Sequence, residues 1–90
     1  MNYKMKIDKI NIGSGLDIRL SKEGWINLDN HKKNGAECIF DLEDIFKGKK
    51  LPFKDEEFVH VYCSHVLEDF INPIPIIDEL VRITKKKRHY

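Results

Sequence analysis

Four short apolar runs divide the first part of the chain, and each ends in small, acidic or polar residues. The runs are rich in Ile, Val, Phe, Tyr and Trp, which favour strands over helices. Several are apolar at successive positions, a pattern typical of strands that are covered on both faces of a sheet. The predicted strands are 6–12, 25–28, 36–40 and 58–63.

The segments between these strands are short. Residues 16–24 and 42–46 each leave room for about one turn of helix. We expect a polar loop at 31–35 and a turn at 51–55, just before the fourth strand. Strands that alternate with such connections predict an open, parallel α/β sheet.

The strongest helical pattern follows the fourth strand. Asn72 is a good N-cap residue, and Pro73 suits the first position of a helix. The positive charges at 85–88 would lie at the negative end of the helix dipole. One apolar stripe, as on a helix that packs against a core, is formed by Ile77, Leu80, Val81 and Thr84.

The first two predicted strands end in residues that suit a small polar ligand. The turn Gly13-Ser14-Gly15 is expected to offer backbone N–H groups, and its glycines leave room for a ligand to approach. Asn11, just before the turn, could reach the polar end of that ligand. The carboxylate of Asp29 could accept two hydrogen bonds from a ribose diol.

The other two strand ends continue this pattern. Asp41 could accept a hydrogen bond from an exocyclic amine such as that of adenine, and Leu42 would contact the ring. Ser64 and His65 close the fourth side. Because ligands of open parallel sheets bind beyond the carboxyl ends of the strands, these residues predict one shared site.

Each of these residues also has a purely structural interpretation. Gly13-Ser14-Gly15 forms a tight turn in many proteins without a ligand. Asp29 and Asp41 could end their strands by accepting backbone hydrogen bonds. Four strand ends with mutually consistent roles favour a site for a nucleoside-type ligand.

Ordered motifs along nearly the whole chain resemble a known family. They are Asn11-Ile12-Gly13-Ser14-Gly15, Gly24-Trp25-Ile26-Asn27-Leu28-Asp29, Asp41-Leu42-Glu43, Leu51-Pro52-Phe53, Ser64-His65-Val66-Leu67-Glu68-Asp69 and a closing Glu79-Leu80-x-Arg82-Ile83. This set resembles the class I S-adenosylmethionine-dependent methyltransferases, and within them the type 11-like group with short loops.

The resemblance implies that S-adenosylmethionine is the cofactor and assigns its contacts. In this assignment the methionine part lies along Gly13, Ser14 and Gly15, the ribose at Asp29 and Asn30, the adenine at Asp41 and Leu42, and the reacting end near Ser64 and His65. Catalysis in such enzymes is mainly alignment of an acceptor with the methyl group. The residues that act in catalysis and the methyl acceptor stay open.

The resemblance also implies a fold and its extent. The expected domain, 1–90, is the N-terminal half of a three-layer, Rossmann-like methyltransferase sheet with strand order 3-2-1-4. This family's sheet normally continues after the last helix of this chain. Without those further strands, the fourth strand would be an edge of the sheet. We therefore expect self-association or pairing with a complementary C-terminal half. Cofactor binding is favoured over turnover by this chain alone.

Two other functions remain as alternatives. One is a non-catalytic interaction module that pairs through the fourth strand. The other is a nicotinamide-binding Rossmann domain, which is disfavoured because Ile18 stands where a Gly-x-Gly-x-x-Gly turn needs its last glycine.

Composition and charge narrow the class of protein further. A net charge of +1 over 90 residues gives no basis for nucleic-acid binding, and no apolar run is long enough for a membrane span. We therefore expect a cytoplasmic protein in which Cys38 and Cys63 are buried, reduced thiols. Cys63-x-His65, with His60 nearby, offers too few ligands for zinc, so no metal is expected.

Overall fold

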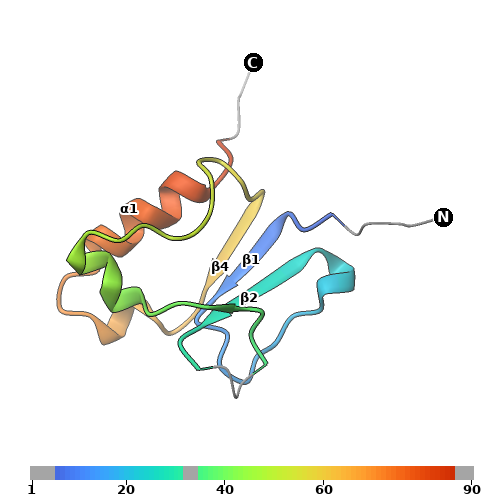
Figure 1. Ribbon diagram of the computed structural model, residues 1–90, viewed down its shortest axis with the longest axis horizontal. Coiled ribbons are helices and arrows are strands. Elements are labelled where there is room, and N and C mark those ends of the chain that lie inside the picture. Colours follow the sequence, from blue (N-terminus) through green and yellow to red (C-terminus); the bar gives the residue numbers. More distant parts are fainter. Residues whose placement is uncertain (1–5, 32–34, 87–90) are drawn as a thin grey trace.

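A computed structural model describes residues 6–31 and 35–86 of the chain. Its centre is a parallel, four-stranded sheet in the order β3-β2-β1-β4 (Figure 1). The strands are β1 (Lys9–Ile12), β2 (Trp25–Asp29), β3 (Cys38–Ile39) and β4 (His60–Cys63). The predicted α/β fold and its strand order are confirmed.

β1, β3 and β4 are shorter than the apolar runs that predicted them, whereas β2 extends one residue beyond the predicted 25–28. The fourth strand was expected to begin at Phe58. This residue lies outside β4 and forms an isolated parallel bridge with Thr84 instead. The Phe58 N–H donates to the carbonyl oxygen of Ile83 at 2.9 Å, and the Lys85 N–H donates to that of Phe58 at 2.7 Å. An apolar run therefore indicates a buried segment, and only part of that segment forms the regular hydrogen bonds of a β-strand.

Short 3-10 helices lie in the two predicted helical connections, and a further 3-10 helix, which was not predicted, follows β4 before the α-helix. They are η1 (Ser21–Glu23), η3 (Leu42–Lys47), η4 (Leu67–Asp69) and α1 (Ile74–Ile83). The side chain of Asn72 accepts a hydrogen bond from the Ile74 N–H at 3.3 Å, although Pro73 holds the N-cap position. The sequence thus identified the capping residue but placed the first helical residue one position early.

The apolar stripe predicted on α1 only partly coincides with the face of the helix that is buried. Ile76 and Ile83 are fully buried, whereas Ile77 is 38% exposed and Val81 is 57% exposed. The helix carries a second apolar row through Ile76, Leu80 and Ile83, at spacings of four and three residues. Periodicity alone could not tell which row faces the core.

The core lies between one face of the sheet and the helices. Ile10, Ile12 and Leu28 from the strands pack with Ile76 and Ile83 from α1. The η3 helix packs beside α1 on this side of the sheet (Figure 1).

The opposite face of the sheet is covered by an irregular segment. Alternation along the strands places Asn11, Asn27 and Tyr62 on this face. The Asn11 amide donates to the Asp17 carbonyl at 2.7 Å, and the Asn27 amide donates to the Arg19 carbonyl at 2.8 Å. Residues 17–19 therefore pack on this face of the sheet without forming a helix.

An ion-pair network fastens α1 to the turn before β4. The guanidinium of Arg82 donates to Glu79 at 2.7 Å, to Asp55 at 2.9 Å and to the carbonyl oxygens of Leu51 and Phe53 at 3.1 and 2.9 Å. Glu79 also accepts from the Leu51 N–H at 2.8 Å. These hydrogen bonds lower the pKa of Glu79 and raise that of Arg82, so both side chains stay charged at neutral pH.

Candidate functional site

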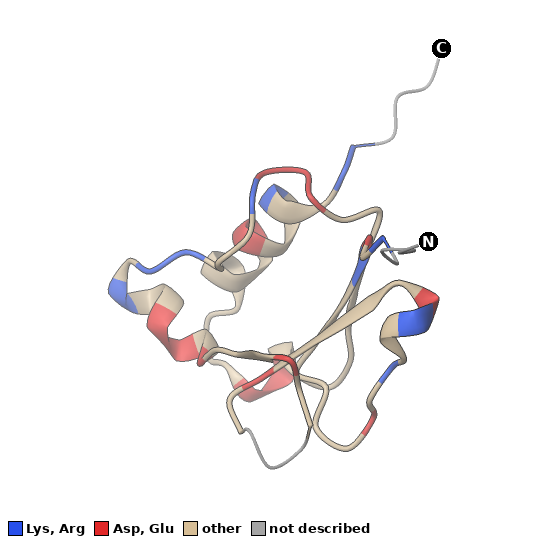
Figure 2. Cartoon of the chain, turned by 45° about the vertical axis from the view of Figure 1, so that its right-hand side comes forward, with Lys and Arg blue, Asp and Glu red and all other residues tan. Residues whose placement is uncertain are grey.

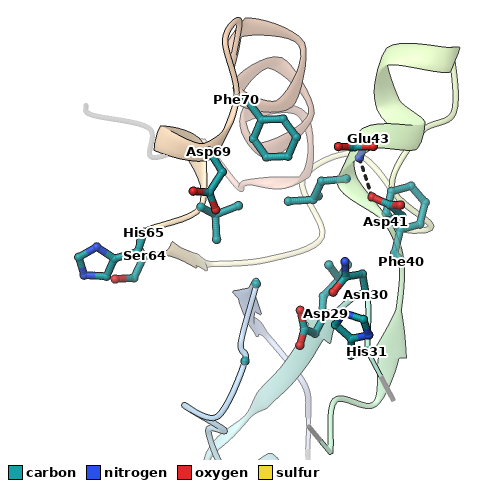
Figure 3. Close-up of a pocket in the computed structure, with 15 residues that line it drawn as sticks. Asp29, Asn30, His31, Phe40, Asp41, Glu43, Ser64, His65, Asp69 and Phe70 are labelled. Atoms are coloured by element: carbon teal, nitrogen blue, oxygen red, sulfur yellow. Dashed lines mark hydrogen bonds between the residues drawn. The ribbon is translucent and has the colours of Figure 1, made fainter. Parts of the chain in front are cut away.

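A cavity of about 490 Å³ opens beyond the carboxyl ends of the strands. Figure 3 shows Asp29 and Asp41 on one side of it and Ser64 and His65 on the other. The lining comprises Gly13, Gly15, Leu28, Asp29, Asn30, His31, Phe40, Asp41, Leu42, Glu43, Ser64, His65, Val66, Asp69 and Phe70. All four predicted strand ends therefore meet at one place.

The glycine turn shapes the cavity, but two of its three expected N–H donors are bonded within the fold. Gly13 and Gly15 have φ of 66° and 51°, in the left-handed region that favours glycine. A Cβ on Gly13 would collide with Cγ2 of Val66, whereas one on Gly15 would meet open space. The N–H groups of Gly13 and Ser14 both donate to the Leu28 carbonyl, at 2.8 and 3.0 Å. The turn offers clearance at this wall, and the prediction that these two N–H groups face a ligand is wrong.

Two predicted site residues, Asn11 and Ser14, do not line the cavity. Asn11 is buried on the opposite face of the sheet, where its amide also donates to Asn27 Oδ1 at 3.1 Å. This orientation follows from the alternation of side chains along β1. Ser14 is 4% exposed, and its hydroxyl has no hydrogen-bond partner among the described residues. The remaining eight predicted residues all line the cavity.

The acidic wall is built by the ends of β2 and β3. Asp29 is the last residue of β2, and Asn30 and His31 follow it into the lining. Asp41 caps η3, since one of its carboxylate oxygens accepts from the Glu43 N–H at 3.0 Å (Figure 3). A carboxylate has several lone pairs, so this cap leaves acceptor capacity on Asp41.

The facing wall follows the end of β4. His65 has φ of 56°, unusual for a residue other than glycine, at the turn from β4 toward η4. Its Nδ1 lies 3.2 Å from Oε1 of Glu68. Left-handed backbone at a non-glycine residue often marks a functional turn, and here it lies at the mouth of the cavity.

Sequence reasoning missed several lining residues. Phe40 and Phe70 provide aromatic surface, and the other unpredicted lining residues are Leu28, His31, Glu43, Val66 and Asp69. Phe40 and Glu43 stand next to the predicted pair Asp41 and Leu42, so adjacency was an available signal. Nothing in the local pattern indicated Phe70, which comes to the cavity through the chain path after η4.

The thiols and candidate metal ligands form no second site in the described residues. Cys38 and Cys63 are free thiols, and the predicted burial is only partial, because both are half-buried. Burial raises the pKa of both thiols, and Glu37 adds to the effect at Cys38. Across residues 6–31 and 35–86 no group of three or more His, Cys, Asp or Glu side chains is placed to hold a metal ion. Over the same residues, no helix is both long and apolar enough for a membrane span.

Comparison with known proteins places this cavity in a family context. Residues 15–89 match the model of a methyltransferase domain. The chain is 41% identical over 76 residues to the uncharacterized protein MJ1123 of Methanocaldococcus jannaschii. That match covers 84% of this chain but 32% of the relative. No solved structure gives a significant match. With a parallel sheet in the expected order and a match over most of its length, the chain belongs to the methyltransferase domain family.

Proposed function

We propose that the cavity binds S-adenosylmethionine and that the chain contributes the cofactor-binding part of a methyltransferase. The observation that carries this proposal is the charge of the lining. Four of the described residues that line the cavity carry carboxylates: Asp29, Asp41, Glu43 and Asp69. None of the described lining residues is Lys or Arg. An acidic cavity suits a ligand with positive sulfonium and ammonium groups.

The same lining disfavours a dinucleotide. A pyrophosphate needs N–H donors or cations, as at the glycine turn of nicotinamide-binding domains. Here the N–H groups of Gly13 and Ser14 are bonded to the Leu28 carbonyl. Two of the three N–H groups of the glycine turn are therefore already bonded, which disfavours a phosphate there, and S-adenosylmethionine carries no phosphate.

The residues present fit the parts of the cofactor. Asp29 at the end of β2 would hold the ribose hydroxyls, and Asp41 with Leu42 and Phe40 would surround the adenine. The open space beside Gly15 would take the methionine part. A volume of about 490 Å³ lies in the range of small-molecule sites. When bound, the cofactor supplies an electrophilic methyl group on a positively charged sulfur.

Methyl transfer by the whole protein is a further part of this proposal. The chain spans 32% of its Methanocaldococcus relative, so most of that relative's length lies outside the match. The cavity residues would orient the cofactor, and the acceptor would approach from the side of Ser64 and His65. Alignment of acceptor and methyl group is then the contribution of the protein to the rate.

Isothermal titration with S-adenosylmethionine and S-adenosylhomocysteine tests the proposal. We expect both to bind, and Asp29→Ala to weaken binding about 100-fold because ribose hydroxyls lose their acceptor. The matched control is Asp78→Ala, which removes the same charge from the exposed surface of α1. A folded chain that gives no heat with either compound, or equal losses in the two variants, would contradict the proposal.

A second candidate function is the interaction module. The specific observation behind it is the outer edge of β4, whose only strand neighbour among the described residues is β1. This edge does not conflict with cofactor binding, because it lies beside the cavity and not in it.

A further inference from the structure

Asn27 is a fully buried polar side chain in the middle of β2, on the face of the sheet away from the core. Its Oδ1 accepts from the Arg19 N–H at 2.9 Å and from the Asn11 amide at 3.1 Å. Its Nδ2 donates to the Arg19 carbonyl at 2.8 Å and to the two carboxylate oxygens of Glu37 at 3.1 and 3.0 Å. The hydrogen-bonding capacity of this amide is therefore fully used, as its burial requires.

The first segment that Asn27 holds comes from the glycine turn. The chain leaves the cavity wall at Gly15 and reaches Arg19, where the backbone N–H and carbonyl both bind the Asn27 side chain. Figure 2 shows this segment leading into η1 on the side of the sheet away from α1. The start of the turn is fixed as well, because the Gly13 N–H donates to the carbonyl of Leu28, the next residue of β2. Asn27 thus anchors the far end of a short loop whose near end is a wall of the cavity.

The second segment that Asn27 holds leads into β3. β2 ends at Asp29 in the cavity wall, and the chain lies beside β2 again at Glu37, directly before β3. The Glu37 carboxylate binds the Asn27 amide and also accepts from the Asn27 backbone N–H at 3.3 Å. This contact continues the pairing of β2 with β3 beyond the register of the two strands. It therefore anchors the chain that goes on to Asp41 in the cavity wall.

We propose that Asn27 is a positioning residue for the cavity, which holds two of its walls in place from the opposite face of the sheet. Asn27 does not line the cavity, so it would act through the two segments and not by contact with a ligand. Without these anchors a ligand would have to order both walls as it binds, and that cost lowers affinity. The expected effect on affinity for S-adenosylmethionine rests on the proposed function, whereas the effect on the two segments does not.

Hydrogen exchange measures the positioning without any ligand. Two amides report on the two segments: the Gly13 N–H, bonded to the Leu28 carbonyl, and the Phe40 N–H, bonded to the Asp29 carbonyl. Asn27→Ala should speed exchange at both about 10-fold, because each segment loses an anchor. Amides in the middle of α1 are the internal control, and their rates should stay within about 2-fold. Equal acceleration in α1 would show that Asn27 acts on global stability alone, and it would overturn the proposal.

Isothermal titration with S-adenosylmethionine measures the effect on affinity. Asn27→Ala should weaken binding about 30-fold, and Glu37→Ala, which releases only the second segment, about 5-fold. The matched control is Thr84→Val, which also removes a hydrogen bond from a side chain to the backbone, at the end of α1 and away from the cavity. It should leave the affinity within about 2-fold of the original.

An exchange of functional groups covers the case in which Asn27→Ala does not fold. Asn27→Asp sets a second carboxylate against Glu37 and should weaken binding about 30-fold. Adding Glu37→Gln returns an amide donor to the pair, with the two groups swapped, and should restore affinity to within about 5-fold of the original. Circular dichroism checks the fold of each variant. A folded double variant that binds no more tightly than Asn27→Asp would overturn the proposal.

The exchange and titration measurements together separate the positioning role from the proposed function. If the intact chain binds neither S-adenosylmethionine nor S-adenosylhomocysteine, but Asn27→Ala loosens both segments, the proposed function fails and the positioning role stands. If the intact chain binds the cofactor and a folded Asn27→Ala binds it equally well, the positioning role fails and the proposed function stands.

Discussion

Two hollows in the described part of the chain are nearly equal in size and opposite in chemistry. The cavity beyond the strand ends measures about 490 Å³. The second is a groove of about 540 Å³ beside β4 and α1, lined by Val61, Leu67, Ile77, Leu80, Val81, Thr84, Lys85 and Lys86. Four carboxylates line the first, whereas aliphatic side chains line most of the second. Volume alone would not distinguish them. The difference teaches that the side chains lining a hollow, and not its size, set the chemistry it can accommodate: acidic and polar in one, apolar in the other.

The largest expected effect is on the ion-pair network that joins α1, one side of the groove, to the turn before β4. Arg82→Ala removes the hydrogen bonds that join α1 to the turn at Leu51 and Phe53 and leaves Glu79 without its cation. We expect a loss of about 3 kcal/mol in the free energy of unfolding. Urea denaturation measures it, and Lys86→Ala, an exposed cation nearby, should change stability by less than about 0.5 kcal/mol. Equal effects of the two variants would show that the network contributes no more than a surface charge.

The next prediction concerns the shape of the cavity. Gly13→Ala should destabilise the fold by about 2 kcal/mol, because the new Cβ collides with Val66 and the backbone has positive φ. Gly15→Ala should cost about 1 kcal/mol, from backbone strain alone, because its surroundings are open. Thermal unfolding compares the two. If Gly15→Ala is the more damaging, the assigned packing of this turn is wrong.

A smaller effect separates the two roles of Asp41. Asp41→Ala should lose both the η3 cap, about 1 kcal/mol, and the proposed adenine contact. Asp41→Asn should keep most of the cap, since Asn is also a good cap residue, while it changes the hydrogen bonding offered to the ligand. Stability and cofactor titration on the same samples give the answer. If Asp41→Asn lost both stability and cofactor binding, the effect of Asp41 on binding would be explained by the η3 cap alone.

The smallest predicted effect depends on pH. The folded pKa of Glu79 lies below its ordinary value of 4.5, so this carboxylate stabilises the fold above that value. The contribution is lost as the pH falls through the lowered, folded pKa. Glu79→Gln should therefore be less stable than the original by about 1 kcal/mol at pH 7, with the gap closing in acid. Urea melts at several pH values measure the gap, and a constant gap would contradict the charge-based explanation.

Much of the fold could be predicted from the sequence because local and global signals agree. The apolar runs located the strands, and Asn72 marked the start of α1. The face of α1 could not be assigned, since Ile76, Leu80 and Ile83 repeat as regularly as Ile77, Val81 and Thr84. That choice depends on which row meets Ile10 and Leu28, which is a tertiary fact.

The candidate site was predictable where residues adjoin a strand end and unpredictable elsewhere. Asp29, Asp41, Ser64 and His65 were found because parallel strands end at one edge of a sheet. Asn11 was misplaced because one step along a strand reverses the side-chain direction. The donors at Gly13 and Ser14 were misjudged because their bonds to Leu28 depend on how β1 and β2 meet.

The covering of the polar sheet face gives the protein a built-in optical probe. Trp25 is the single tryptophan, and its ring lies 4.8 Å from the Arg19 guanidinium and 5.4 Å from the His60 ring. Its emission therefore reports on the junction of residues 17–19 with β2 and β4, away from the acidic cavity. Fluorescence should follow detachment of that segment and stay nearly silent when a ligand enters the cavity, which separates unfolding from binding in one sample.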